Sequence, residues 1–98
     1  MTGYSLAAAL GVASGPPGAA NLAQGRKLYS QICTSCHGPD GNLVAGHELS
    51  TLKRRRDLAD TIAFIRNPKA PMPALYPSLI NEQNVTDVAT YVLQELAR

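Results

Sequence analysis

The feature that most constrains this chain is the segment Cys33-Thr34-Ser35-Cys36-His37, which contains both of its cysteines. Two cysteines separated by two residues, with histidine directly after the second, form the pattern at which haem is attached covalently to a protein. Each thiol adds to one vinyl group at one edge of the haem, and the spacing of the cysteines matches the separation of those groups. The adjacent histidine then lies where its imidazole can bind the iron. The pattern therefore predicts one haem c held by Cys33 and Cys36, with His37 as an axial ligand.

Three other roles are open to the same cysteine pair. A thioredoxin-type redox motif follows a strand and opens a helix, whereas the residues before Cys33 have a helical pattern. A zinc site needs four ligands; only Cys33, Cys36, His37 and His47 are available, and the adjacent Cys36 and His37 rarely bind one ion. A disulfide between the two cysteines would close a very tight loop, and disulfide geometry is demanding. Haem attachment is favoured over all three.

The length of the chain agrees with a small cofactor-binding domain. Its 98 residues make one domain at most. A domain of this size buries a modest core and usually needs a metal, a disulfide or a cofactor to stabilise it. The formal net charge of +2 is too small to indicate a nucleic-acid partner, and two haem propionates would nearly cancel it.

The first 20 residues differ in composition from the rest. They are rich in Gly, Ala, Ser and Pro, and residues 15–18 read Gly-Pro-Pro-Gly, which is typical of a linker. The apolar run over residues 6–13 resembles a signal peptide but lacks the basic residues that precede one, and it is too short to span a bilayer. We expect a flexible tail, linker or signal remnant over residues 1–20, and a folded domain over residues 21–98. A tether, or a short helix covering the haem or a partner, is the alternative.

Helical patterns begin and end the expected domain. Asn21 is a suitable N-cap for a helix over residues 22–32. Gly25 inside it indicates the close approach of another element, since glycine costs about 1 kcal/mol against alanine in a helix. A second amphipathic helix follows Asn81. Because a short amphipathic helix must pack on a neighbour, we expect the two to pack together, with Gly25 as the gap and Tyr91 as the ring that fills it.

Between these helices lies a long loop that follows the cysteine motif. Turn-forming residues are dense over residues 38–42, and a loop of this length usually wraps something, here the haem. An iron-bound histidine normally donates its second ring N–H to a carbonyl or carboxylate, so we expect a backbone carbonyl in this loop to accept from His37. His47 could be a second axial ligand, although a lone loop histidine is more often a surface or hydrogen-bonding residue.

A basic run and a third helix come next. Residues 53–56 read Lys-Arg-Arg-Arg, which is most often a solvated face. The alternatives are a docking patch for an acidic redox partner, or an arginine that pairs with a haem propionate. Asp57 is a suitable cap for the third helix, which Asn67-Pro68 should end because the residue before proline is disfavoured in helical geometry.

Met72 lies in the second informative segment. Pro71 and Pro73 flank it and stiffen the backbone. Methionine is more often a core residue than a ligand, but Met72 is the only methionine besides Met1, and enough chain separates it from His37 to pass around a haem. A thioether opposite an imidazole is a known haem arrangement that raises the reduction potential. Met72 is therefore the predicted second axial ligand, with core packing as the alternative.

Residues 20–98 resemble a class I c-type cytochrome. The matching residues are Gly25 and Tyr29, Cys33, Cys36 and His37, the segment 65–68 before Met72 and Pro73, and the segment 87–92. The resemblance implies an all-α, small cytochrome c fold of about three to four helices around one haem, with N- and C-terminal helices crossing near Gly25 and Tyr91. It implies His37 and Met72 as the metal ligands, one-electron transfer rather than enzyme activity, and a periplasmic or other extracytoplasmic location.

One departure from the family pattern concerns the loop after the motif. Such proteins often carry Gly-Pro-x-Leu there, and the proline carbonyl accepts from the ligand histidine. Here Gly46 is followed by His47, so His47 occupies the proline position. The carbonyl of His47 can still be the acceptor, but the loop loses the rigidity that a proline gives.

The function expected is outer-sphere electron transfer between redox protein partners, through the haem edge near Cys33 and Cys36. No nucleic acid and no membrane span are expected, and the chain is a monomer or a subunit of a redox complex. The alternatives are a haem subunit or domain of a larger oxidoreductase, or a ligand-binding or peroxidase-like protein if Met72 is labile. The neighbours of Met72 argue against a peroxidase, because they include no acid–base residue: Ala70, Pro71, Pro73 and Ala74.

Overall fold

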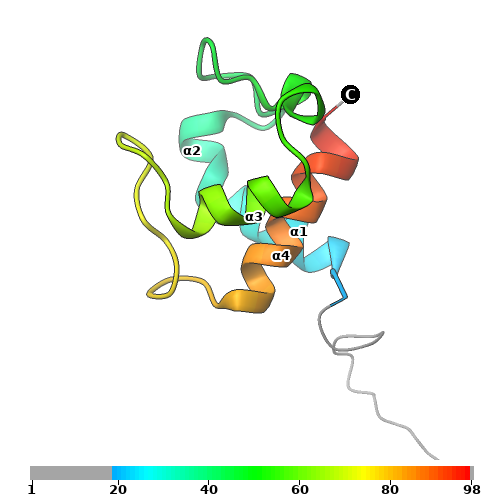
Figure 1. Cartoon of the computed structure of the whole chain (residues 1–98), viewed down its shortest axis with the longest axis vertical. Coiled ribbons are helices and arrows are strands. Elements are labelled where there is room, and N and C mark those ends of the chain that lie inside the picture. The colour runs from blue at the N-terminus through cyan, green and yellow to red at the C-terminus, as the bar shows by residue number, and fades with distance from the viewer. Residues whose placement is uncertain (1–18, 98) are drawn as a thin grey trace, which may run out of the picture.

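The structure, a computed structural model, describes residues 19–97, and within that range it contains helices and loops but no strand (Figure 1). The expected all-α fold is therefore confirmed. All but residues 19 and 20 of the expected N-terminal tail lie outside the described residues. In chain order the elements are α1 (Leu22–Leu28), η2 (Tyr29–Cys33), α2 (Thr34–His37), η3 (Leu49–Arg54), α3 (Leu58–Arg66), α4 (Glu82–Tyr91) and η4 (Val92–Leu96).

The first helix is longer than expected. The segments α1, η2 and α2 follow one another without a break, and η2 is a π-helical turn. The Asn21 side chain accepts from the Gln24 N–H at 3.1 Å, which confirms the predicted N-cap. The helix does not end at residue 32 but continues through the cysteine motif to Gly38, whose φ is +81°. Gly38 can adopt this angle because it has no Cβ, and it turns the chain out of the helix directly after His37.

The crossing of the first and last helices takes place at Gly25, as expected (Figure 1). A Cβ added to Gly25 would collide with the backbone carbonyl oxygen of Asp87 and lie 2.9 Å from the Cβ of Tyr91. One turn further along, the ring of Tyr29 packs against that of Tyr91, with centroids 5.6 Å apart and planes at 48°. The glycine thus lets the two backbones approach, and the tyrosine pair packs beside the crossing.

The other two helix starts are capped as the sequence predicts. The Asp57 side chain accepts from the Asp60 N–H at 2.8 Å at the start of α3, and Asn67 ends that helix. At the start of α4, Asn81 and Asn84 bond each other's backbone N–H groups through their side chains. These reciprocal bonds satisfy donors that a helix terminus leaves unpaired.

The hydrophobic core is built on α4 and η4. These segments pack against α1, α3 and η3, and most of their inward-facing residues are buried: Val85, Val88, Ala89, Val92 and Leu93. The core also takes in Tyr29, Leu52 and Ile65 from the elements around them. Within residues 19–97, none of the helices has both the length and the apolar character needed to cross a membrane.

Candidate functional site

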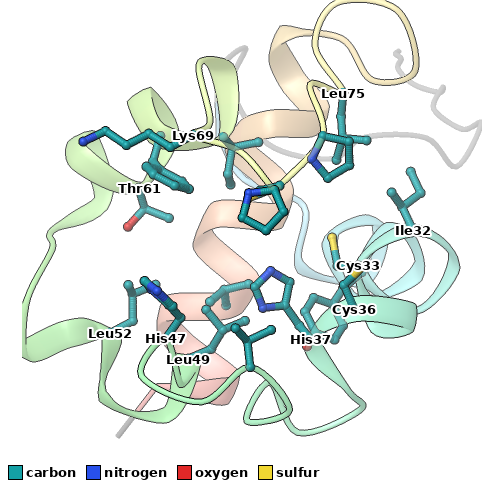
Figure 2. A pocket seen from close by; sticks show the side chains of 18 of the residues that line it. Ile32, Cys33, Cys36, His37, His47, Leu49, Leu52, Thr61, Lys69 and Leu75 are labelled. Atoms are coloured by element: carbon teal, nitrogen blue, oxygen red, sulfur yellow. The ribbon is translucent and has the colours of Figure 1, made fainter.

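A cavity of about 570 Å³ opens between the first helix, the loop after it, η3, α3 and the loop that follows α3 (Figure 2). Its size is in the range of pockets that hold small molecules and cofactors. All four residues predicted to bind a cofactor line it, namely Cys33, Cys36, His37 and Met72. Much of the remaining wall is apolar, including Ile32, Val44, Leu49, Phe64 and Leu75. The fold thus brings a thiol pair, an imidazole and a thioether to one largely apolar space.

The two cysteines lie together at one end of the cavity (Figure 2). No disulfide joins them; Cys33 is half-buried and Cys36 is exposed. Burial, with a smaller contribution from Cys36, raises the pKa of the Cys33 thiol to about 11. Catalytic cysteines of redox motifs have lowered pKa values instead, so the environment of Cys33 argues against a thioredoxin-type role. The part of the chain that the structure describes contains no group of three or more His, Cys, Asp or Glu side chains placed to hold a metal ion.

His37 occupies the last turn of α2, where its side chain enters the cavity. Burial, and to a smaller extent the nearby His47, lowers the pKa of the His37 imidazole, which favours the neutral ring that can bind a metal. The Nδ1 atom of His37 is buried and has no hydrogen-bond partner among the described residues. Since buried polar atoms are nearly always paired, this ring has bonding capacity that the protein itself leaves unused. If the other ring nitrogen binds a cofactor, Nδ1 stays unpaired, so the fit to a cofactor rests on the neutral imidazole that lines the cavity.

The expectation that a loop carbonyl accepts from His37 is not met, because Nδ1 has no partner. The loop instead satisfies its own backbone: the His47 N–H donates to Val44 at 3.0 Å, and the Leu49 N–H donates to Gly41 at 2.9 Å. In the absence of a proline at position 47, these internal bonds shape the loop. The His47 carbonyl accordingly does not take the role that the family pattern suggested.

His47 also lines the cavity, and it lies on the same wall as His37. Figure 2 shows both histidines on one wall, while Lys69 and Leu75, which bracket the Met72 loop in the sequence, lie on the opposite wall. A flat group bound between the walls would meet His37 on one face and the Met72 loop on the other. This arrangement disfavours His47 as the ligand opposite His37.

Met72 is half-buried in the loop between α3 and α4. Its N–H donates to the Lys69 carbonyl at 3.1 Å, and the flanking Pro71 and Pro73 are exposed. The buried Leu75 follows three residues later and anchors the segment to the core. The backbone around Met72 is therefore held by a turn on one side and by core packing on the other.

The basic run is divided by the helical turn η3. Lys53 and Arg54 are exposed and do not line the cavity, whereas Arg55 and Arg56 do. The Arg55 guanidinium donates to the Glu48 carbonyl at 2.7 Å, and that of Arg56 lies 4.8 Å from the centre of the Phe64 ring. These two arginines follow Leu52, which Figure 2 shows at the end of the cavity away from the cysteines. Sequence reasoning treated the four basic residues alike because it did not foresee this turn.

A further cavity residue that sequence reasoning did not assign to the site is Tyr29. Its position four residues before Cys33 indicated helix packing only, yet it lines the cavity and its hydroxyl donates to the Gly38 carbonyl at 2.6 Å. No sequence signal could have found this bond, because it depends on where the chain turns after His37.

Comparison with known proteins gives a consistent result. A sequence profile for the family described as "Cytochrome C oxidase, cbb3-type, subunit III" matches residues 20–92. A protein named cytochrome c6 from Synechococcus sp. is 34% identical over 92 residues, which cover 87% of this chain and 80% of that protein. Cytochrome c6 of Parathermosynechococcus lividus is 36% identical, covering 81% of this chain and 95% of the relative. Cytochrome c6 of Nostoc sp. is 40% identical, covering 82% and 76%.

Proposed function

We propose, given that this chain belongs to the class I c-type cytochromes, that its cavity holds the haem through Cys33 and Cys36, with His37 and Met72 as axial ligands. As a member of that family the chain carries one covalent haem c and is a one-electron carrier, not an enzyme. The observation that carries the residue assignment is that these four side chains, from two separate parts of the chain, line one cavity.

Each of these residues would do a different task. The Cys33 and Cys36 sulfurs would form thioether bonds that keep the cofactor attached to a domain too small to enclose it. The neutral His37 imidazole and the Met72 thioether would bind the iron from opposite walls, so no coordination site is left for a substrate. When bound, the haem supplies one electron reversibly at its iron. The apolar walls exclude water, and together with the identity of the axial ligands they set the reduction potential.

The charged end of the cavity suits the propionates. In a haem these carboxylates lie at the edge opposite the vinyl groups, and Cys33 and Cys36 would hold the vinyl edge. Arg55, Arg56 and Lys69 line the cavity, and Leu52 and Lys69 lie at its far end in Figure 2. We infer that these cations pair with the propionates, as charge-assisted hydrogen bonds favour. Lys53 and Arg54 are free to form a solvated or docking surface.

Electrons would enter and leave at the cysteine end, because the exposed Cys36 brings that end of the cavity to the surface. A redox protein partner would dock there over a small, transient interface; no nucleic acid is expected to bind. The folded domain would span residues 21–98, with residues 1–20 as a tail, linker or signal remnant. The site of action proposed is the periplasm or an equivalent extracytoplasmic compartment, as the resemblance implies.

A second assembly is favoured by one observation. The description of the matching family names a subunit of an oxidase. The alternative is therefore that the chain is a haem subunit or domain of a larger oxidoreductase complex, in which it would transfer electrons in the same way. Size-exclusion chromatography of native material distinguishes the two, since a free carrier elutes as a small monomer and a subunit elutes with its complex.

Visible spectra of the oxidised and reduced holoprotein test the ligand assignment. The wild type is expected to be low-spin, to show the weak sulfur-to-iron charge-transfer band and to retain its haem in acidified acetone. Met72→Ala should lose the band and have a lower reduction potential. His47→Ala is the matched control and should change neither. Release of the haem by acidified acetone would refute covalent attachment, and an unchanged Met72→Ala spectrum would remove Met72 as a ligand.

A further inference from the structure

The hydroxyl of Tyr29 makes a contact that the packing of its ring does not require. Tyr29 is 2% exposed, and its ring packs at the helix crossing against Tyr91. A phenylalanine would fill nearly the same volume. The hydroxyl, however, donates to the Gly38 carbonyl at 2.6 Å in a buried setting, and this bond spans the whole of the Cys33–His37 motif. A short, buried hydrogen bond of this kind is costly to break, because the Gly38 carbonyl would keep only its longer bond from the Gly41 N–H, at 3.2 Å.

The carbonyl that Tyr29 binds belongs to the residue directly after His37. The peptide group between His37 and Gly38 is held on both sides: its carbonyl accepts from the Leu43 N–H at 3.0 Å, and its N–H donates to Thr34 at 2.8 Å. The next peptide group precedes Pro39 and so has no N–H. Its only polar atom is the Gly38 carbonyl oxygen, which accepts from the Tyr29 hydroxyl at 2.6 Å and, over a longer distance, from the Gly41 N–H at 3.2 Å.

We propose that Tyr29 is a positioning residue for the axial imidazole: its hydroxyl holds the Gly38 carbonyl and thereby fixes the backbone that carries His37. The inference deepens the proposed function and rests on it, since it takes His37 as an iron ligand. It has particular weight in this chain because the His37 ring has no hydrogen bond of its own at Nδ1 among the described residues. The orientation of the ring thus depends on its backbone and on the packing around it, whereas metal-bound histidines are usually oriented by a partner at the second ring nitrogen.

Two further observations support this role. Gly38 has a φ of +81°, and a Cβ placed there would lie 3.2 Å from the Cβ of Leu43, so the turn whose carbonyl Tyr29 binds is one that a residue with a side chain would strain. Burial raises the pKa of Tyr29 to about 12. The hydroxyl therefore stays protonated, and so stays a donor, over the whole physiological pH range.

The test uses holoprotein matured in a host that attaches haem c. Tyr29→Phe keeps the ring and removes only the hydroxyl. Tyr91→Phe is the matched control. It removes the hydroxyl of the partner ring, and that hydroxyl makes no hydrogen bond among residues 19–97. Two readouts report the iron rather than the fold: the reduction potential, and the hyperfine-shifted haem methyl resonances of the ferric protein, which depend on the orientation of the axial ligands.

Tyr29→Phe is expected to raise the reduction potential and to alter the pattern of methyl shifts, because a less firmly oriented imidazole stabilises ferric iron less well. Tyr91→Phe should match the wild type in both. Wild-type values in Tyr29→Phe would overturn the proposal even if the variant unfolds more easily. Equal changes in both variants would also overturn it, because they would trace the effect to the ring pair and not to the bond with Gly38.

A measurement on the wild type covers the case in which Tyr29→Phe does not fold. In the diamagnetic ferrous protein, the Tyr29 hydroxyl proton should exchange slowly with solvent and show a nuclear Overhauser effect to Gly38. Rapid exchange would overturn the inference. Failure of the proposed function is seen separately, because the wild type would then lack a low-spin spectrum or a reversible one-electron couple before any variant is made.

Discussion

Replacement of Gly25 by alanine should destabilise the holoprotein, although alanine is the better helix former. The added Cβ would meet the carbonyl oxygen of Asp87, the carbonyl carbon of Asp87 at 2.8 Å and the Cβ of Tyr91 at 2.9 Å. None of these atoms can rotate away, so α1 and α4 must separate. Overpacking of this kind costs about 1–3 kcal/mol, and backbone contacts favour the upper end. The gain in helix propensity offsets about 1 kcal/mol, which leaves a net loss of about 2 kcal/mol.

For a domain of this size a loss of about 2 kcal/mol lowers the Tm by roughly 8–16 °C. The assay is thermal unfolding of the ferric holoprotein, followed by far-ultraviolet circular dichroism. Ser30→Ala, at an exposed position of the same helical segment, is the control and should stay within about 0.5 kcal/mol of the wild type. A Gly25→Ala protein as stable as the wild type would show that the helices do not cross as closely as described.

Two further results are expected. Burial raises the pKa of Tyr29 from 10.0 to about 12, so between these pH values the folded protein keeps a proton on Tyr29 that the unfolded chain loses. The free energy of unfolding should therefore be highest below pH 10 and should fall as the pH rises towards 12. Urea unfolding across that range should show the decline in the wild type and a smaller one in Tyr29→Phe, and identical slopes would contradict the burial of the hydroxyl. The chain without haem should lack a cooperative unfolding transition, because a largely apolar cavity of about 570 Å³ would be left without the group that completes the core of a small domain. Calorimetry of a Cys33→Ala/Cys36→Ala protein made without haem checks this, and a sharp transition near that of the holoprotein would refute it.

The haem-free prediction follows from how the core is distributed. The buried side chains gather along α4 and η4, and the side of the molecule between Cys33 and Met72 is a cavity. In a chain of 98 residues the cofactor would thus complete the core as well as carry the electron. This arrangement agrees with the general need of small domains for a stabilising group.

Local signals in the sequence predicted the helix starts well. Asn21, Asp57 and Asn81 each cap a helix with their own side chains, because capping involves atoms within three residues of one another. The end of the first helix was placed too early, at residue 32. The apolar pattern fades there, but helical geometry continues until Gly38 allows the chain to turn.

The sequence by itself determined the cofactor chemistry and the close helix crossing. The Cys33, Cys36 and His37 spacing matches the pattern that covalent haem attachment requires, and Gly25 marks a contact that only a residue without a side chain permits. The tertiary structure alone decided that His47 lies on the wall of His37, that Arg55 and Arg56 line the cavity while Lys53 and Arg54 do not, and that Tyr29 reaches Gly38. These features depend on how the loops after His37 and before α3 turn in space. No pattern of neighbouring residues encodes such turns, because they result from contacts between segments that are distant in the chain.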